Sequence, residues 1–347
     1  METPSDGIDA PDALSVSRSS PTKCQVRTRL YHRGEVAAEG FPVAEVSDHL
    51  DVPETMVWLD LRAPDKADLA VLSEEFGLHP LAVEDAVQER QRPKLDRYKS
   101  HLFLNAYVVR LDAVTAELVT SEVAAFITPT ALITVRKDDG LDIDTVIDRW
   151  DQSADLGVHG VGFLLQGLLD VIVDSHFTTV ESLDDQLDTL EGQLFADKPA
   201  DRAVQRRSFE LRKSVVLLRR VVLPMREVVN ALLRRDLHVV DEALQPYYQD
   251  IYDHVLRATE WTESLRDLVT TIMETNLTIQ GNRMNTISKK VTSWAAIIAV
   301  PTFITGFAGM NLPYPGFAQH WGLAVVVAIM VASPVGLYLS FKRKDWL

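Results

Sequence analysis

Cysteine is almost absent from this sequence, and its scarcity excludes two kinds of site. The single cysteine, Cys24, lies in a polar N-terminal segment, so neither a disulfide framework nor a thiolate metal site can form within the chain. The sequence also contains no HExxH, no phosphate-binding glycine loop ending in Lys-Ser or Lys-Thr, and no CxxC. The scarcity of cysteine fits a reducing compartment. The missing motifs give no reason to expect an enzyme or an organic cofactor.

Positive charge is scarce over most of the chain. The formal net charge is −15, and residues 281–347 carry +5, so the preceding 280 residues carry −20. Nucleic-acid surfaces need clustered lysine and arginine, so no nucleic-acid partner is expected. An acidic body of this kind suits an environment rich in cations.

The N-terminal segment METPSDGIDAPDALSVSRSS lacks the apolar stretch that a signal peptide requires. Its polar composition is typical of a segment that cannot bury a core. We therefore expect a disordered tail over residues 1–25 and an N-terminus that stays in the cytoplasm.

Charge is missing altogether from two C-terminal runs, residues 291–308 and 323–341. Each run is close to the roughly 20 apolar residues that cross a bilayer as a helix. Two buried core helices are the alternative, but uncharged runs of this length are atypical of soluble cores. Two transmembrane helices are therefore predicted, with an outer loop over residues 309–322 between them.

Basic residues flank these runs at one end of each only. The loop 309–322 holds no lysine or arginine, whereas the outer flanks of the two runs contain Lys289, Lys290, Lys342, Arg343 and Lys344. By the positive-inside rule, both ends of the pair face the cytoplasm and the loop faces out. We expect a multi-pass protein of the plasma membrane with both termini cytoplasmic and a basic C-terminus over residues 342–347.

The remaining sequence predicts an α/β domain followed by helices. Alternating or β-branched segments predict strands at 56–61, 101–109, 122–128 and 131–137, within an α/β domain over residues 26–150. Apolar residues then recur every three or four positions, which predicts a helical bundle over residues 151–245, with one helix ending at Pro224. A single stalk helix over residues 246–308, roughly 90 Å long at 1.5 Å per residue, is expected to continue into the first transmembrane helix.

Two transmembrane helices cannot enclose a water-filled path alone, so transport would require a symmetric ring of subunits. Polar or small residues recur every seven positions along the first helix, as a hydrated pore wall requires, at Asn285, Thr292, Ala299 and Gly306. Three further positions are expected to line the same path: Ser288, Val291 and Thr302. Small residues also favour helix packing in membranes, and the stripe alone does not separate the two interpretations.

A Gly-Met-Asn tripeptide, residues 309–311, lies at the outer end of this helix. A ring of Asn311 side chains and Gly309 carbonyls would present neutral oxygen acceptors to an arriving ion. Mg²⁺ loses its water shell reluctantly, so amide oxygens that accept hydrogen bonds from that shell are chemically reasonable. The thioether of Met310 is too soft for a hard cation and is better explained by packing.

In these motifs the chain resembles the CorA-type magnesium channel family. The resemblance rests on GMN at 309–311 and on segments that match in order along almost the whole chain: FGLHPLAVEDAVQERQRPKLDRY (76–98), VVLPMREVVNALLRRD (221–236), YYQDIYDH (247–254) and FKRKDWL (341–347). It implies a funnel-shaped homopentamer with the first transmembrane helix lining the pore. It also implies passive Mg²⁺ influx driven by membrane potential, with Co²⁺ and Ni²⁺ as possible substitutes.

The resemblance also implies roles for individual residues. Gly309, Met310 and Asn311 match the selectivity motif, and Asn285 matches a polar ring near the cytoplasmic end of the pore. Asp85 and Asp250 match carboxylates that bind regulatory Mg²⁺ between neighbouring subunits, and Glu84 and Asp170 match a second interfacial site. Facing carboxylates repel when empty and are bridged by a divalent ion, which would close the pore at high cytosolic Mg²⁺. The alternative is that these four acids are merely solvated.

The sequence departs from the family pattern in two places. The outer loop LPYPGFAQHWG has no acidic residue, and its His320 is either a borderline ligand for Zn²⁺, Co²⁺ or Ni²⁺ or an interfacial polar residue. Ser288, Val291 and Ala299 occupy positions where the family often has Met or Leu, which predicts a wider or wetter constriction.

Two other functions remain open at this point. One is transport of Zn²⁺ or Co²⁺ by a member of the same superfamily. The zinc-transporting branch usually replaces the motif's methionine, so Met310 weighs against it. The other is a membrane-anchored sensor or scaffold that conducts nothing. A scaffold should tolerate replacement of Asn285 and Asn311, whereas a channel should lose selectivity or flux.

Overall fold

The computed structural model describes residues 24–50, 52–88, 91–194, 202–234, 237–310, 315–316 and 319–347. The chain forms two units, Met1–Leu268 and Val269–Leu347, and the long helix α7 (Gln245–Ala308) contributes to both. Residues 1–23 of the expected tail, and Asn311, lie outside the described residues. The strand β1 begins at Gln25, so the predicted tail boundary at residue 25 is too late.

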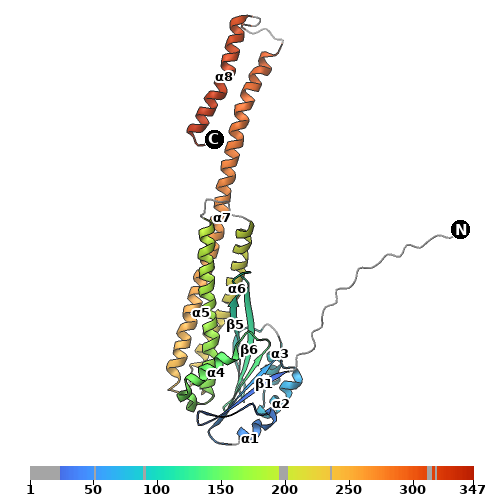
Figure 1. Ribbon diagram of the computed structural model, residues 1–347, viewed down its shortest axis with the longest axis vertical. Helices are drawn as coiled ribbons and strands as arrows, with labels where there is room; N and C mark the ends of the chain where they lie inside the picture. Colours follow the sequence, from blue (N-terminus) through green and yellow to red (C-terminus); the bar gives the residue numbers. More distant parts are fainter. Residues whose placement is uncertain are drawn as a thin grey trace, which may run out of the picture. The chain divides into compact units, whose positions relative to one another are not determined.

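The first unit is built on a seven-stranded sheet in the order β2-β1-β3-β7-β6-β5-β4. Three of these strands, β1, β5 and β6, are labelled in Figure 1. Only β3 and β7 run parallel, and the other neighbours are antiparallel. The strands are β1 (Gln25–His32), β2 (Glu35–Glu39), β3 (Thr55–Arg62), β4 (Lys94–Arg97), β5 (Leu102–Leu111), β6 (Leu118–Ile127) and β7 (Ala131–Arg136).

Helices cover both faces of this sheet. One face packs against α1 (Val46–Leu50), α2 (Lys66–Phe76) and α3 (Pro80–Val87), around buried residues that include Leu59, Leu69, Ala82 and Phe103. The other face packs against α4 (Ile143–Gln152), α5 (Val161–Leu194), α6 (Arg202–Leu232) and the start of α7. Short 3₁₀ turns precede α1 and α5, at Val43–Glu45 and Ala154–His159.

The helix α5 closes an open part of the sheet edge. Pairing of β4 with β5 ends at Asn105, so the β5 backbone beyond that point has no strand on this side. Side chains of α5 take its place: Ser175 Oγ accepts from Val109 N at 3.2 Å, and Thr179 Oγ1 donates to Val109 O at 3.1 Å. Unpaired backbone groups at a sheet edge are costly when buried, so these bonds fix the rotation of α5 against the sheet.

A close approach between α4 and α5 fixes a second contact. A Cβ on Gly167 would lie 2.5 Å from Trp150 Nε1, so only glycine leaves room for the indole. Trp150 Nε1 donates to Leu164 O at 3.0 Å, and its ring meets Trp58 edge-on at 5.0 Å between centroids. The end of α4 is thereby held against the first half of α5.

Most of the predicted elements are confirmed. The four predicted strands correspond to β3, β5, β6 and β7, and the continuous helix from residue 246 to 308 corresponds to α7. The prediction that a helix ends at Pro224 is wrong, because α6 continues to Leu232. Burial of Val228, Val229 and Leu232 at about 1.5–3 kcal/mol each outweighs the roughly 3 kcal/mol that an interior proline costs.

The second unit contains the remainder of α7 and the helix α8 (His320–Arg343), which begins and ends slightly outside the uncharged run predicted at 323–341. Gly316 has φ of +90°, and a Cβ on Gly322 would lie 2.2 Å from the Gly316 carbonyl oxygen. Glycine at both positions lets the turn cross the first turn of α8 closely.

Candidate ion path and regulatory carboxylates

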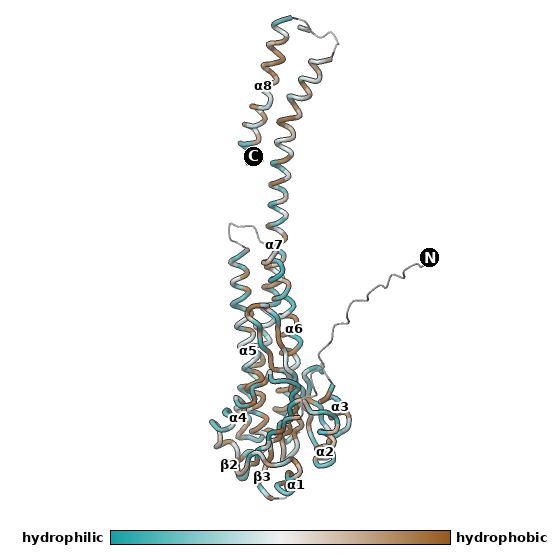
Figure 2. Tube along the Cα trace, turned by 45° about the vertical axis from the view of Figure 1, so that its right-hand side comes forward, coloured by the Kyte–Doolittle hydropathy of each residue, from teal (hydrophilic) through white to brown (hydrophobic). Residues whose placement is uncertain are grey.

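Three described helices are long and apolar enough to cross a membrane, and burial separates them. The apolar window of α5 is 67% buried within the chain, whereas those of α7 and α8 are each 6% buried. Figure 2 shows hydrophobic residues along α8 and the last part of α7. A soluble protein rarely exposes apolar surface on this scale. The helix α5 is therefore a core helix of the first unit, and α7 and α8 fit membrane insertion.

The C-terminal end of α8 suits a membrane boundary. Lys342 and Arg343 occupy its last turn, and the Lys342 ammonium lies 6.0 Å from the centroid of the Tyr338 ring. Trp346 stacks on Phe341, with 5.6 Å between ring centroids. Aromatic and basic side chains of this kind are enriched where a span meets water.

The Gly-Met-Asn motif begins directly at the end of α7. Gly309 N donates to Thr305 O at 2.9 Å, and Met310 N donates to Phe307 O at 3.2 Å, so both residues continue the last helical turn. The Met310 residue is 42% exposed. Asn311 lies outside the described residues, so its role in selection stays a prediction.

The expected pore stripe is accessible from Asn285 to Gly306 of α7. All seven positions are exposed in the chain: Asn285, Ser288, Val291, Thr292, Ala299, Thr302 and Gly306. The Thr302 hydroxyl donates to Ile298 O at 2.8 Å and is satisfied within the helix. Exposure does not single the stripe out, since Ile298 and Phe303 between its members are exposed as well. Pore lining stays a prediction.

The first expected regulatory carboxylate, Asp85, lies on α3 and is ion-paired within the chain. His79 caps this helix through Nδ1, which accepts from Leu81 N at 3.2 Å, and Pro80 begins the first turn. Lys94 Nζ lies 2.6 Å from Asp85 Oδ2 and 2.7 Å from Asp96 Oδ2. Glu84 is exposed and accepts a hydrogen bond from Gln88 at 2.6 Å.

The other two expected carboxylates belong to helices on the opposite face of the sheet. Asp170 lies on α5 and Asp250 on α7, and the Asp250 side chain is 68% exposed. Because α3 covers one face and these helices cover the other, Asp85 and Asp250 are not assembled into one site by a single chain. A site that joins them requires a neighbouring copy.

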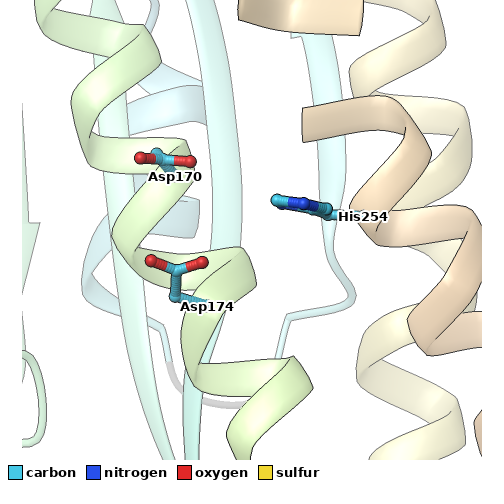
Figure 3. Close-up of side chains that lie close together, drawn as sticks. All are labelled: Asp170, Asp174 and His254. Carbon is cyan, nitrogen blue, oxygen red and sulfur yellow. The ribbon is translucent and has the colours of Figure 1, made fainter. Parts of the chain in front are cut away.

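A cluster that the sequence alone did not reveal surrounds Asp170. Asp174 follows one turn later on α5, and His254 extends from α7 toward these carboxylates (Figure 3). One ligand atom from each of the three residues lies within 4.8 Å of the others, close enough to hold a metal ion. The spacing of Asp170 from Asp174, and of Asp250 from His254, is i to i+4, which was a usable signal for a shared helix face.

Arg149 in the last turn of α4 offsets part of the negative charge of this cluster. Its guanidinium contacts Asp170, and Nη2 lies 2.8 Å from Asp174 Oδ2. Burial raises the pKa of Asp170 above its ordinary value; Arg149 opposes that shift and the nearby carboxylates Asp174 and Asp250 add to it. Since a carboxylate that is costly to ionise gains most from a cation, the cluster has the electrostatic character of a cation site.

Comparison with known proteins identifies the class. Two exposed apolar helices follow the α/β domain in the chain, as in a two-span membrane protein. The model of the CorA-like Mg2+ transporter protein family matches residues 53–343. The chain therefore belongs to the CorA-like Mg²⁺ transporter family.

Individual relatives cover most of the chain. It is 30% identical over 296 residues to the cobalt/magnesium transport protein CorA of Thermotoga maritima, covering 84% of each chain. It is 25% identical over 316 residues to the cobalt/magnesium transport protein CorA of Methanocaldococcus jannaschii, covering 90% of this chain and 98% of that one. The complete structure of the CorA magnesium transporter from the latter organism superimposes with a TM-score of 0.74 at 23% identity, covering 92% of this chain and 98% of that chain.

Proposed function

We propose that this chain forms a homo-oligomeric channel for Mg²⁺ influx down the electrochemical gradient, with five subunits as the family resemblance implies. The exposed α7 and α8 carry the proposal, because two helices of one chain cannot surround a hydrated path. Family membership supports divalent-cation transport, and two relatives that are cobalt/magnesium transport proteins support Mg²⁺ and Co²⁺ as substrates.

The proposed path runs along the stripe of α7 and ends at Gly309, Met310 and Asn311. The cytosol receives the ion, since the basic residues flanking both helices favour cytoplasmic termini. High cytosolic Mg²⁺ closes the channel by bridging Asp85 of one subunit to Asp250 of another, and by binding at Glu84 and Asp170. This regulation is supported by the exposed Asp250 carboxylate and by the placement of Asp85 on the opposite face of the sheet.

The test is uptake by proteoliposomes with a trapped indicator under an inside-negative potential, using Mg²⁺, Co²⁺, Ni²⁺ and Zn²⁺ in parallel. Mg²⁺ influx above that of protein-free vesicles is expected, and it should stop when Mg²⁺ is raised on the side that the first unit faces. Zn²⁺ influx without Mg²⁺ influx would replace this function by zinc transport. Correctly oriented protein that passes none of the four ions would be a sensor or scaffold.

A further inference from the structure

Two of the four carboxylates expected to bind regulatory ions are ion-paired with a basic side chain of the same chain. Lys94 holds Asp85 at 2.6 Å, and Arg149 contacts Asp170 and holds Asp174 at 2.8 Å. The other two have no such cation among the described residues: Glu84 accepts from the neutral Gln88, and Asp250 has His254 at 4.0 Å. The ion-paired carboxylates are also the less exposed ones, with side chains 23% and 13% exposed for Asp85 and Asp170.

Arg149 is positioned by the fold rather than by chance contact. Its neighbour Trp150 is buried against Gly167 and Leu164 of α5, which places the last turn of α4 beside Asp170. Asp170 and Asp174 lie one helical turn apart, so one planar guanidinium serves both carboxylates. The Arg149 side chain is 37% exposed, so it can move into water without burying its charge.

Lys94 is held in a comparable way on the other face of the sheet. Its strand β4 is fixed by pairing with β5, where Lys94 lies opposite Asn105. Lys94 Nζ also lies 2.7 Å from Asp96 Oδ2, so two carboxylates hold its ammonium group. Its ammonium lies 5.7 Å from the centroid of the Phe103 ring.

We propose that Lys94 and Arg149 are tethered competitors that a divalent ion must displace from Asp85 and Asp170, and that they thereby set the Mg²⁺ concentration at which the channel closes. The inference rests on the proposed function, since it concerns the same regulatory carboxylates. An ion needs the oxygens that these side chains now occupy, so binding exchanges a single positive charge for a double one. A competitor of this kind shifts the closing threshold and leaves conduction through the open pore unchanged.

The test is titration of purified full-length protein in detergent with MgCl₂ by calorimetry, together with the Mg²⁺ dependence of flux inhibition. Lys94→Met and Arg149→Gln are each expected to tighten Mg²⁺ binding by about tenfold and to lower the inhibitory Mg²⁺ concentration by a similar factor. Arg219→Gln is the matched control, since Arg219 pairs with Glu263 at 3.3 Å and with none of these carboxylates. It should leave both values unchanged.

Folded Lys94→Met and Arg149→Gln variants that bind Mg²⁺ with wild-type affinity, or more weakly, would overturn the inference. Arg149→Lys is the second variant, for use if Arg149→Gln does not fold. It keeps the positive charge but loses the planar guanidinium that contacts both carboxylates. Its Mg²⁺ affinity should lie above that of the wild type, and an equal or lower affinity would count against competition. Asp85→Asn separates the two proposals: if it weakens Mg²⁺ binding while Lys94→Met does not strengthen it, regulation stands and the competitor is rejected. If neither changes binding, both fail.

Discussion

Asp60 and Arg136 form a buried, bidentate ion pair across the two parallel strands of the sheet. Arg136 Nη2 lies 2.6 Å from Asp60 Oδ2, and the side chains are 7% and 1% exposed. Thr134 Oγ1 donates to Asp60 Oδ1 at 2.7 Å, and Arg136 Nη1 donates to Leu141 O at 3.1 Å. The pair therefore links β3, β7 and the segment that leads into α4.

Removing one partner of this pair should strongly destabilise the first unit. Arg136→Met leaves the Asp60 carboxylate buried without its cation, and we expect a loss of about 3–5 kcal/mol in the free energy of unfolding. Urea denaturation followed by tryptophan fluorescence measures it, since Trp58 and Trp150 lie in the core. The double variant Arg136→Met with Asp60→Leu should recover part of the loss, and a single variant as stable as the wild type would contradict this account.

Gly167→Ala tests how α4 is held against α5. The added Cβ would meet Trp150 Nε1 at 2.5 Å, so the indole must move and Arg149 must move with it. A cost of about 1–3 kcal/mol in stability is expected, as for overpacked cores. Gly192→Ala is the matched control, because nothing lies within 4 Å of a Cβ there. Equal stability of the two variants would show that the close approach is unimportant.

The stability of the first unit should depend on pH through His101. Burial, and then the nearby His79, lowers the pKa of His101, so the folded state resists a proton that the unfolded state accepts below about pH 6.5. Stability attributable to this group is therefore complete above that pH and falls as the pH is lowered. His101→Phe keeps the ring between Tyr98 and Phe126 and removes the titration. The difference in Tm between variant and wild type should move in favour of the variant from pH 7.5 to pH 5.0. A constant difference would reject His101 as a source of the dependence.

Accessibility within the assembled protein tests the stripe of α7. In a Cys24→Ser background, Thr292→Cys and Ala299→Cys should react with a charged thiol reagent from water. Ile297→Cys and Ile304→Cys, on the opposite side of the helix at 100° per residue, should react slowly if that side packs or meets lipid. Reactivity measured by mass shift distinguishes the sides. Equal protection of all four positions would favour small-residue helix packing over a hydrated wall.

The sequence predicts those elements whose pattern is local. Strands β3, β5, β6 and β7 are apolar or alternating, and α7 and α8 are long, so their periods are visible in the residues themselves. Strands β1, β2 and β4 are not predicted, because QVRTRLYH and KLDR are largely polar and EVAAE is too short to show a period. Their pairing comes from neighbouring strands and from ion pairs such as Arg29 with Asp151, at 2.7 Å, which no single segment contains.

The site residues also fall into those that a local segment predicts and those that depend on tertiary packing. The motif at residues 309–311 and Asp85, Asp170 and Asp250 follow from segments that match the family. The contacts of Lys94 and Arg149 do not, because each joins side chains of two different elements, α3 with β4 and α4 with α5, and neither segment alone shows how the two pack. They depend on the docking of α4 through Trp150 and on the register of β4, both of which are tertiary features.

The proposed channel depends on a selective ion path that ends at the Gly-Met-Asn motif. The most direct test compares Mg²⁺ influx into proteoliposomes containing the wild type, Asn311→Ala, and Asn230→Ala as an exposed asparagine of α6. We expect Asn311→Ala to abolish Mg²⁺ influx or its preference over other divalent ions, while Asn230→Ala behaves as the wild type. Unchanged flux and unchanged ion preference in a correctly folded Asn311→Ala oligomer would contradict the account.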